Sequence, residues 1–329
     1  MKKLTTPPHV GHKTFLYSEL VTELTNIEAD IAILGMPFSS AYSAHAFTND
    51  QSRAPQYLRD MSDRIVRHPD HYDFDIDGPL LQGRKDIKFV DCGDVIPDLS
   101  KPLGEHHQRA AEAIRQLLRA KALPIVLGGD HGITTPILQG FDEVGPITLV
   151  HIDAHLDWRE EVNGVDTGLS SPIRRASEMK HIGEIFQIGL RAQGSGRPAD
   201  YQAAKDYGAH VIPAYELHEV GMQAILDRIP DNSNYYISID ADGIDPSIMP
   251  GVDGPAPGGV TYLQARSLIH GLVKKGRVVG MDIVEITPAK DIPSKLTGVT
   301  AGRFVVNLIG ASIRAGYFNK KWRSQLMLC

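Results

Sequence analysis

The chain alternates between short apolar runs and longer amphipathic stretches. Apolar runs closed by Gly, Pro or polar residues predict strands over 31–37, 124–127, 147–152, 185–190, 210–212, 235–240 and 277–283. Between and after these runs, apolar residues recur at helical spacing and predict helices over 105–121, 216–229, 261–275 and 298–313. Strands that alternate with helices of this length indicate an α/β protein with three layers, α/β/α, around a mostly parallel central sheet.

Helix-end signals and the absence of linkers give the domain organisation. Thr261 is a typical N-cap, Gly276 follows the same helix, and Pro230 ends the helix before it. The sequence has no internal repeat, low-complexity tract or Pro/Ser-rich linker. We therefore expect a single domain over 1–329 with a core of about 30–315, although length alone would favour about two domains.

Two stretches without periodicity predict loops. Residues 38–55 follow the first strand, where parallel sheets usually build the walls of a site. Residues 67–83 are dense in Asp, His and Tyr and predict a surface loop whose histidines are solvated.

Composition excludes several classes of function. The 329 residues include 42% hydrophobic and 22% charged residues, with a formal net charge of −6 and no run of Lys or Arg. This argues against a nucleic-acid partner and against a membrane surface. The two cysteines, Cys92 and Cys329, cannot form a disulfide framework and indicate a reducing compartment. The N-terminus does not resemble a signal peptide, and no apolar run looks long enough to span a bilayer, so we expect a cytoplasmic protein.

The stretch His151-Ile152-Asp153-Ala154-His155-Leu156-Asp157 contains two imidazoles and two carboxylates. In extended backbone His151, Asp153, His155 and Asp157 project to one side of the chain. The stretch follows the buried run 147–150, so this side would lie at the carboxyl end of a strand. The pattern predicts a metal-ligand array; the alternative is a polar strand end with solvated charges.

Three further motifs follow predicted strands. Gly128-Gly129-Asp130-His131 offers His131 as a ligand, with Asp130 expected to orient that imidazole. Ser238-Ile239-Asp240-Ala241-Asp242 places Asp240 and Asp242 on one side, and Asp282-Ile283-Val284-Glu285 ends in Glu285. Each motif alone is more often a turn or a surface pair. Four motifs at strand ends together are specific for a site.

Charge balance favours a binuclear centre. Asp153, Asp157, Asp240 and Asp242 carry four negative charges, which would balance two divalent cations when the histidines bind as neutral ligands. Oxygen and imidazole ligands without thiolate suit Mn²⁺, and imidazole also admits Ni²⁺, Co²⁺ or Zn²⁺. Two such cations about 3.5 to 4 Å apart can make a water molecule nucleophilic near neutral pH.

Together the motifs Gly-Gly-Asp-His at 128, Asp-Ala-His-x-Asp at 153, Ser-x-Asp-x-Asp-x-x-Asp-Pro at 238 and Glu-x-x-Pro at 285 resemble the ureohydrolases, the family of arginases and agmatinases. The resemblance covers about residues 30–315, and Pro250-Gly251 and Gly258-Gly259 look more like the agmatinase branch. It implies an arginase-like fold, two metal ions and a homo-oligomer, trimer or hexamer; from the ligand chemistry we expect Mn²⁺ before Ni²⁺.

The resemblance also implies roles for residues. One metal would be held by His131, Asp153, Asp157 and Asp240, and the other by Asp153, His155, Asp240 and Asp242. Glu285 would bind the guanidinium group of the substrate through paired N–H bonds. Asp157 would accept a proton from the nucleophile and pass it to the departing amine.

The chain departs from the family pattern at two positions that we assign to substrate binding. Thr167-Gly168 stands where relatives carry a His-Gly pair whose histidine can shuttle protons, and Val252-Asp253-Gly254 stands where agmatinases have Thr-Gly-Thr. Asp253 could bind a cationic tail or brace a turn. His45 and His181 are candidates to replace the shuttle, but a lone loop histidine is more often solvated or structural.

The implied reaction is metal-dependent hydrolysis of a small guanidino compound to urea and an amine. Agmatine, guanidinobutyrate, guanidine and biguanide are the substrate types that we consider. Two alternatives stay open from the sequence: a catalytically silent subunit of a mixed oligomer, and a hydrolase of formimidoyl groups.

Overall fold

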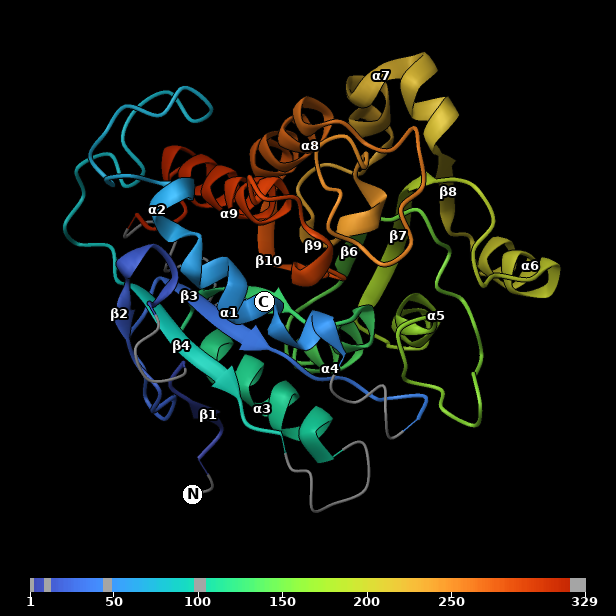
Figure 1. Ribbon diagram of the computed structural model, residues 1–329, viewed down its shortest axis with the longest axis horizontal. Helices are drawn as coiled ribbons and strands as arrows, with labels where there is room; N and C mark the ends of the chain where they lie inside the picture. Colours follow the sequence, from blue (N-terminus) through green and yellow to red (C-terminus); the bar gives the residue numbers. More distant parts are fainter. Residues whose placement is uncertain (1–2, 9–12, 44–48, 98–104, 320–329) are drawn as a thin grey trace.

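A ten-stranded sheet forms the centre of the computed structural model, which describes residues 3–8, 13–43, 49–97 and 105–319 (Figure 1). The strands are β1 (Thr5–Thr6), β2 (Glu19–Leu20), β3 (Ile31–Met36), β4 (Phe89–Val95), β5 (Leu123–Gly128), β6 (Ile147–Ile152), β7 (Ile182–Leu190), β8 (His210–Pro213), β9 (Asn234–Asp240) and β10 (Arg277–Val284). Their order is β1-β4-β3-β5-β10-β9-β6-β7-β8, with β2 also paired to β4. All pairs are parallel except β1 with β4.

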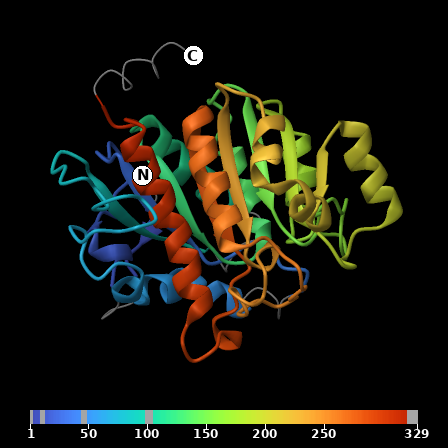
Figure 2. The ribbon, with the colours of Figure 1, turned by 90° about the horizontal axis from the view of Figure 1, so that it is seen from above.

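Helices cover both faces of the sheet, as the two views show (Figures 1 and 2). The α-helices are α1 (Ala54–Asp60), α2 (Ser62–Ile65), α3 (Glu105–Arg119), α4 (Thr134–Gln139), α5 (Pro172–Ser177), α6 (Pro198–Tyr207), α7 (Ala214–Arg228), α8 (Tyr262–Lys275) and α9 (Leu296–Arg314). Side chains of α1, α2, α7, α8 and α9 share one apolar core, and those of α3, α4, α5 and α6 share the other. The predicted three-layer α/β/α fold with a mostly parallel sheet is confirmed.

The helices that the sequence pattern did not predict have ten residues or fewer. The helices α4 and α5 have six residues each, less than two turns, so no helical period can be read from them. The predicted helix 216–229 corresponds to α7, but Gly221 at φ 79° interrupts its helical backbone. Residues 67–83 contain no regular helix or strand, and His68 and His71 are exposed, as expected for a surface loop.

The helix α9 corrects the expectation that no segment is long enough to span a bilayer. Its 19 residues reach that threshold by length and apolar composition, but 83% of its most apolar window is buried inside the protein. It packs beside α8 in the layer seen in front of the sheet in Figure 2, as a core helix does. Cys92 is buried and free, and Cys329 lies outside the described residues.

The four strands that precede the sequence motifs are neighbours in the order β5-β10-β9-β6. Their pairing register joins Leu127 to Ile283, Val284 to Asp240, and Ile239 to Ile152. The carboxyl ends of these strands therefore lie at one level. Residues that are far apart in the sequence can therefore meet there, such as those after Leu127 in β5 and Glu285 after β10, which are 158 positions apart.

Candidate metal centre

The first group of ligand candidates surrounds His131. This residue opens a short 3-10 helix, η3 (His131–Ile133), directly after β5 and the turn at 129–130. Its Nδ1 lies 3.0 Å from Oδ2 of Asp157, 3.1 Å from Oδ2 of Asp240 and 3.3 Å from Oδ2 of Asp153. All four side chains are buried. One imidazole nitrogen thus faces three carboxylate oxygens that come from two strand ends.

The second group surrounds His155. Its Nδ1 lies 3.1 Å from Oδ2 of Asp242 and 3.5 Å from Oδ1 of Asp153. Asp153 therefore turns one oxygen to His131 and the other to His155. A carboxylate in this position is suited to bridge two cations. The side chain of His155 is 29% exposed, so the second group is open to solvent and the first is closed.

Several polar atoms at the centre are buried without an aligned hydrogen bond. They are Nδ1 of His131, Nε2 of His151 and Oδ2 of Asp153. Buried polar atoms normally have partners, since leaving them unpaired costs about 1 to 3 kcal/mol each. A cation between His131 and the carboxylates would give a partner to Nδ1 of His131 and to Oδ2 of Asp153. The residues present therefore fit a metal.

The pKa shifts of His131 and Asp240 also indicate that the centre favours a positive charge. Burial lowers the pKa of His131, but Asp153, Asp157 and Asp240 more than offset this and raise it well above its usual value. Burial, together with Asp242 and Asp153, raises the pKa of Asp240 well above the usual aspartate range. Without a cation, the clustered carboxylates and His131 therefore bind protons, which a metal ion would displace.

Hydrogen bonds fix which nitrogen of His131 is free. The hydroxyl of Ser238 donates to Oδ1 of Asp282 at 2.7 Å, so its oxygen is left to accept from Nε2 of His131 at 3.1 Å. Asp282 also accepts from Thr134 at 3.0 Å and from Tyr236 at 2.8 Å. With its proton on Nε2, a neutral His131 directs the lone pair of Nδ1 into the centre. This is the tautomer that a metal ligand needs.

His151 lies in the same cluster but has the opposite tautomer. The amide oxygen of Gln187 accepts from the Trp158 indole at 2.6 Å, so its NH₂ group donates to Leu156 at 2.8 Å and to Nδ1 of His151 at 3.2 Å. Neutral His151 then carries its proton on Nε2, 2.9 Å from Oδ2 of Asp153. It is therefore placed as a proton-bearing neighbour of Asp153 and not as a ligand, a distinction the sequence did not provide.

The two ligand loops approach each other at a glycine. A Cβ at Gly243, which ends the short helix η4 (Ala241–Gly243), would lie 2.5 Å from the backbone nitrogen of Asp153. Any side chain there would push the loops apart. Asp157 and Glu285 both have a positive φ, 54° and 61°, which costs energy for residues other than glycine. Strain of this kind is typical of functional sites.

Glu285 lies beside the first group. Its Oε1 accepts from the backbone N–H of His131 at 2.7 Å, and its Oε2 accepts from the side chain of Gln51 at 3.1 Å. Burial and the nearby Asp130 raise the pKa of Glu285 to about 8. Gln51 lies in the short helix η2 (Asp50–Arg53), within the loop that we expected to form a wall of the site. No sequence signal identified it.

The loop at 38–43 contacts the segments around the site. Ser39 donates to Asp130, and Ser40 Oγ lies 2.9 Å from Oγ1 of Thr167 and 3.3 Å from Nε2 of His107. Asp130 also accepts from Asn49 at 3.2 Å. Asp130 therefore braces loops, and the expectation that its carboxylate orients the imidazole of His131 was wrong.

A family model for the arginase family matches residues 29–310. The chain belongs to the arginase family. It is 31% identical to the N(1)-aminopropylagmatine ureohydrolase of Thermus thermophilus over 70% of this chain and 77% of that one. It is 28% identical to the agmatinase of Halalkalibacterium halodurans over 87% and 93%. The structure resembles proclavaminate amidino hydrolase from Streptomyces clavuligerus, at 26% identity and a TM-score of 0.76 over 94% and 100% of the two chains.

Membership decides the class of chemistry. Arginase-family enzymes use a binuclear divalent metal centre, and this chain is a ureohydrolase, a hydrolase of C–N bonds in linear amidines. The agmatinases among its relatives agree with the branch that the motifs suggested. The described residues contain two groups that could hold a metal ion, one with His131 and one with His155, and the two groups share Asp153.

The remaining candidates are Asp253, His181 and His45. Asp253 is exposed and forms an ion pair with Lys290. A Cβ at the adjacent Gly254 would lie 3.6 Å from Cε1 of His155, so the pair is close to the open second group. His181 contacts the carbonyl of Leu138 at 2.8 Å, away from the ligands, and His45 lies outside the described residues.

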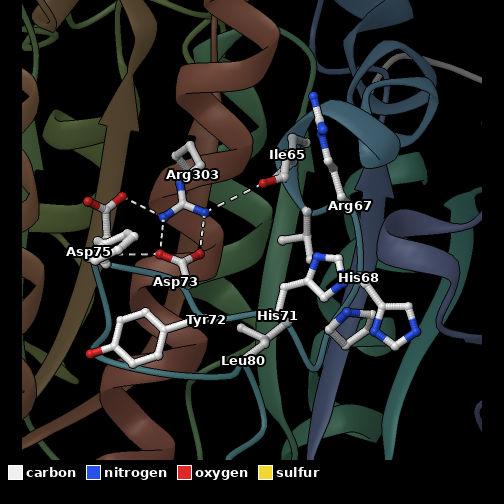
Figure 3. A pocket seen from close by; sticks show the side chains of 12 residues that line it. Ile65, Arg67, His68, His71, Tyr72, Asp73, Asp75, Leu80 and Arg303 are labelled. Carbon is white, nitrogen blue, oxygen red and sulfur yellow. Dashed lines mark hydrogen bonds and ion pairs between the residues drawn. The ribbon is translucent and has the colours of Figure 1, made fainter.

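One further cavity does not involve the arginase-family site. It has a volume of about 390 Å³ and lies between the loop 67–75 and α9. Figure 3 shows Arg303 paired there with Asp73 and Asp75, with His68 and His71 on the opposite wall. Arg303 pairs with both acids, and among the described residues none that lines the cavity belongs to a group that could hold a metal ion. This cavity is separate from the catalytic centre.

Proposed function

We propose that this enzyme hydrolyses a small guanidino compound to urea and an amine at a binuclear centre. Agmatine, guanidinobutyrate, guanidine or a biguanide is the type of substrate. The observation that carries the proposal is the position of His131 Nδ1, within 3.3 Å of three buried carboxylate oxygens and beside Glu285. A guanidinium group held by Glu285 would lie next to the cations.

The residues on hand divide into two ligand sets. His131, Asp153, Asp157 and Asp240 would hold one ion, and Asp153, His155, Asp240 and Asp242 the other. The ions would activate a water molecule for attack on the guanidinium carbon. Mn²⁺ suits these oxygen and imidazole ligands, and Ni²⁺ is the alternative.

Glu285 and Asp157 have different roles in this reaction. The Glu285 carboxylate can accept two guanidinium N–H bonds in one plane, and the bonds from His131 and Gln51 keep it oriented. A bound guanidinium also supplies the positive charge that favours ionised Glu285. Asp157 would accept the proton of the attacking water and deliver it to the departing amine, because its carboxylate lies 3.0 Å from Nδ1 of His131, at the centre of the first group.

The substrate tail would extend toward Thr167 and Asp253. Thr167 presents a hydroxyl that is bonded to Ser40, and Asp253 with Lys290 places both signs of charge near the open side of the centre. Asp253 would favour a tail that carries an amine, as in agmatine. Lys290 would favour a tail that carries a carboxylate, as in guanidinobutyrate.

A urea-release screen tests the proposal. Protein stripped of metal is reconstituted separately with Mn²⁺ and Ni²⁺ and assayed with a panel of guanidino compounds and one formimidoyl compound. We expect urea from at least one guanidino compound, and no urea from Asp153→Asn or Asp240→Asn. Absence of bound metal together with absence of urea from the whole panel would overturn the proposal.

Asp253→Asn and Lys290→Met then identify the tail. If the tail is cationic, Asp253→Asn raises KM and Lys290→Met does not; an anionic tail gives the opposite result. Guanidine itself has no tail, so neither variant would change its KM. We also propose a cytoplasmic homo-oligomer, a trimer or hexamer, which light scattering on the purified enzyme would test.

A further inference from the structure

Arg191 follows β7 directly, and its guanidinium group is enclosed by backbone carbonyls. Nη1 donates to Gly189 at 3.0 Å and to Gly243 at 3.1 Å, and Nη2 donates to Asp242 at 2.6 Å. Nε and Nη2 both donate to Ala256, at 3.0 and 2.7 Å. Nη2 also lies 3.3 Å from the carbonyl of Ile244. These bonds occupy all five N–H groups of the guanidinium.

This environment is unusual for an arginine. Guanidinium groups in proteins commonly pair with carboxylates or phosphates, but within the described residues none of the ion pairs involves Arg191. Its hydrogen bonds go to the main chain of three separate segments: the end of β7, the loop 242–244 and the loop at 256. The function of such an arrangement is to hold these segments at fixed positions.

Arg191 contacts two loops that carry proposed metal ligands, one through its side chain and one through its backbone. Its side chain binds the carbonyl of Asp242 itself, and its backbone N–H donates to the carbonyl of Ala154 at 3.0 Å, between Asp153 and His155. One residue thus joins both ligand loops on the side of His155 and Asp242. Gly259 leaves the room that this needs, since a Cβ there would lie 2.6 Å from Nη2.

The side chain of Arg191 does not contact His131 or Glu285. None of its hydrogen bonds reaches η3, which contains His131, or the residues that follow β10. Loss of its guanidinium would free the carbonyl of Asp242 and leave that of Gly243 with only the N–H of Val260, so the loop 242–244 could move away from Asp153. His131 and Asp157 would keep their own supports.

We propose that Arg191 is a positioning residue that fixes the separation of His155 and Asp242, and that it therefore controls occupancy of the second metal position and not the first. This inference rests on the proposed binuclear centre. The two metal positions would then differ in what supports them. The first is formed by a buried cluster of side chains, and the second depends on an arginine that is not itself a ligand.

Metal titration of Arg191→Met and Arg191→Lys tests the proposal. Calorimetry with Mn²⁺ should show two bound ions in the wild-type chain. We expect Arg191→Met to keep one tight ion and to bind the second at least about 10-fold more weakly, the size seen for residues that support ligands. Lysine cannot supply five donors in a plane, so Arg191→Lys should fall between them. The EPR spectrum should change from that of a coupled Mn²⁺ pair to that of a single ion.

Arg266→Met is the matched control. Arg266 also donates from two nitrogens to a backbone carbonyl, that of Asp75, but on α8 and away from both ligand loops. The Arg266→Met variant should be less stable than the wild-type chain but should have the same metal stoichiometry and EPR spectrum.

The outcomes separate this inference from the proposed function. Two equally tight ions and a coupled spectrum in Arg191→Met would overturn the role of Arg191 and leave the proposed function intact. Equal weakening of both positions would also overturn it, because Arg191 would then support the fold in general. If the wild-type chain binds no metal, the proposed function itself fails. Should Arg191→Met not fold, Arg191→Lys decides by the same measurements.

Discussion

The backbone N–H of His131 donates to the carboxylate of Glu285 at 2.7 Å. This bond joins the residue that centres the first metal group to the residue that we assign to the guanidinium group. The return bond runs from the N–H of Glu285 to the carbonyl of Gly129 at 2.9 Å. The ends of β5 and β10 are therefore locked together, and a substrate bound to Glu285 would be held at a fixed position relative to the cations.

Removing the charge of Glu285 should reduce catalysis without removing metal. Glu285→Gln keeps the size of the side chain but loses a charge-assisted pair worth about 1.5 to 3 kcal/mol, so kcat/KM should fall about 10- to 100-fold. Gln51→Ala should have a smaller effect in the same direction, because it removes only one of the bonds that orient Glu285. Both variants should retain two ions per chain. Loss of metal in Glu285→Gln would show that Glu285 supports the ligands instead.

Ser238→Ala should weaken metal binding, since it removes the acceptor that keeps the proton of His131 on Nε2. Supporting residues of this kind typically change metal affinity by about 10- to 100-fold. Calorimetry with Mn²⁺ measures the change. Ser312→Ala is the control, because Ser312 is also a fully buried serine but lies on α9, and its hydroxyl has no hydrogen-bond partner among the described residues. Equal metal affinity in the two variants would contradict the tautomer assigned to His131.

The sequence predicts the framework of the site well because that framework is local. His131, Asp153, Asp240 and Glu285 each follow an apolar strand, and parallel strands bring their carboxyl ends to one edge. The order β5-β10-β9-β6 could not be read from the sequence, yet any order that places these strands together gives a similar cluster. The ligand candidates were therefore found without knowledge of the topology.

Other contacts in the site could not be predicted from the sequence. Gln51 meets Glu285 across 234 positions of chain, and Ser40 meets Thr167 across 127. Loops 38–43 and 49–53 have no periodicity, so their path depends on what they pack against. The different tautomers of His131 and His151 depend on Ser238 and Gln187, and no pattern in the sequence links either residue to its histidine.

Asp240→Asn should separate metal binding from the stability of the metal-free protein. Burial and the neighbouring acids raise the pKa of Asp240 well above its usual value, so the metal-free folded chain must either bind a proton there or bury an uncompensated charge, and both destabilise it relative to the unfolded chain. The variant should melt at an equal or higher temperature than the wild-type chain in EDTA. Added Mn²⁺ should stabilise the wild-type chain and have little effect on the variant. The control Asp206→Asn, on α6, should respond to EDTA and to Mn²⁺ like the wild-type chain. If Asp240→Asn melts at a lower temperature than the wild-type chain in EDTA, Asp240 stabilises the metal-free fold and the prediction is wrong.

His107 should make the enzyme less stable in mild acid. Burial and the adjacent His106 lower the pKa of His107 to about 3. Between the ordinary histidine value of about 6.5 and that value, only the unfolded chain binds the proton, so stability falls as the pH decreases. For this one group the loss at pH 5 is about 2 kcal/mol relative to pH 7.5. Urea unfolding in EDTA at the two pH values measures the free energy of unfolding. Its fall from pH 7.5 to pH 5 should be about 2 kcal/mol smaller in His107→Gln than in the wild-type chain. Parallel pH dependence in both proteins would mean that His107 is protonated in the folded state.

Gly168→Ala should disturb the loop that carries Thr167. A Cβ at Gly168 would lie 2.2 Å from Cε1 of Tyr42, and the Tyr42 hydroxyl is held in place by the N–H of Ser170 at 2.9 Å. The ring cannot turn away without losing that bond, so the substitution should cost about 1 to 3 kcal/mol, as overpacking typically does. Tyr42→Ala makes room for the added methyl group. The double variant should therefore lose clearly less than the sum of the two single losses, with a coupling of about 1 kcal/mol or more in a double-mutant cycle of unfolding free energies. Additive losses would show that Gly168 is needed for its backbone alone, and that Tyr42 does not fix the position of Thr167.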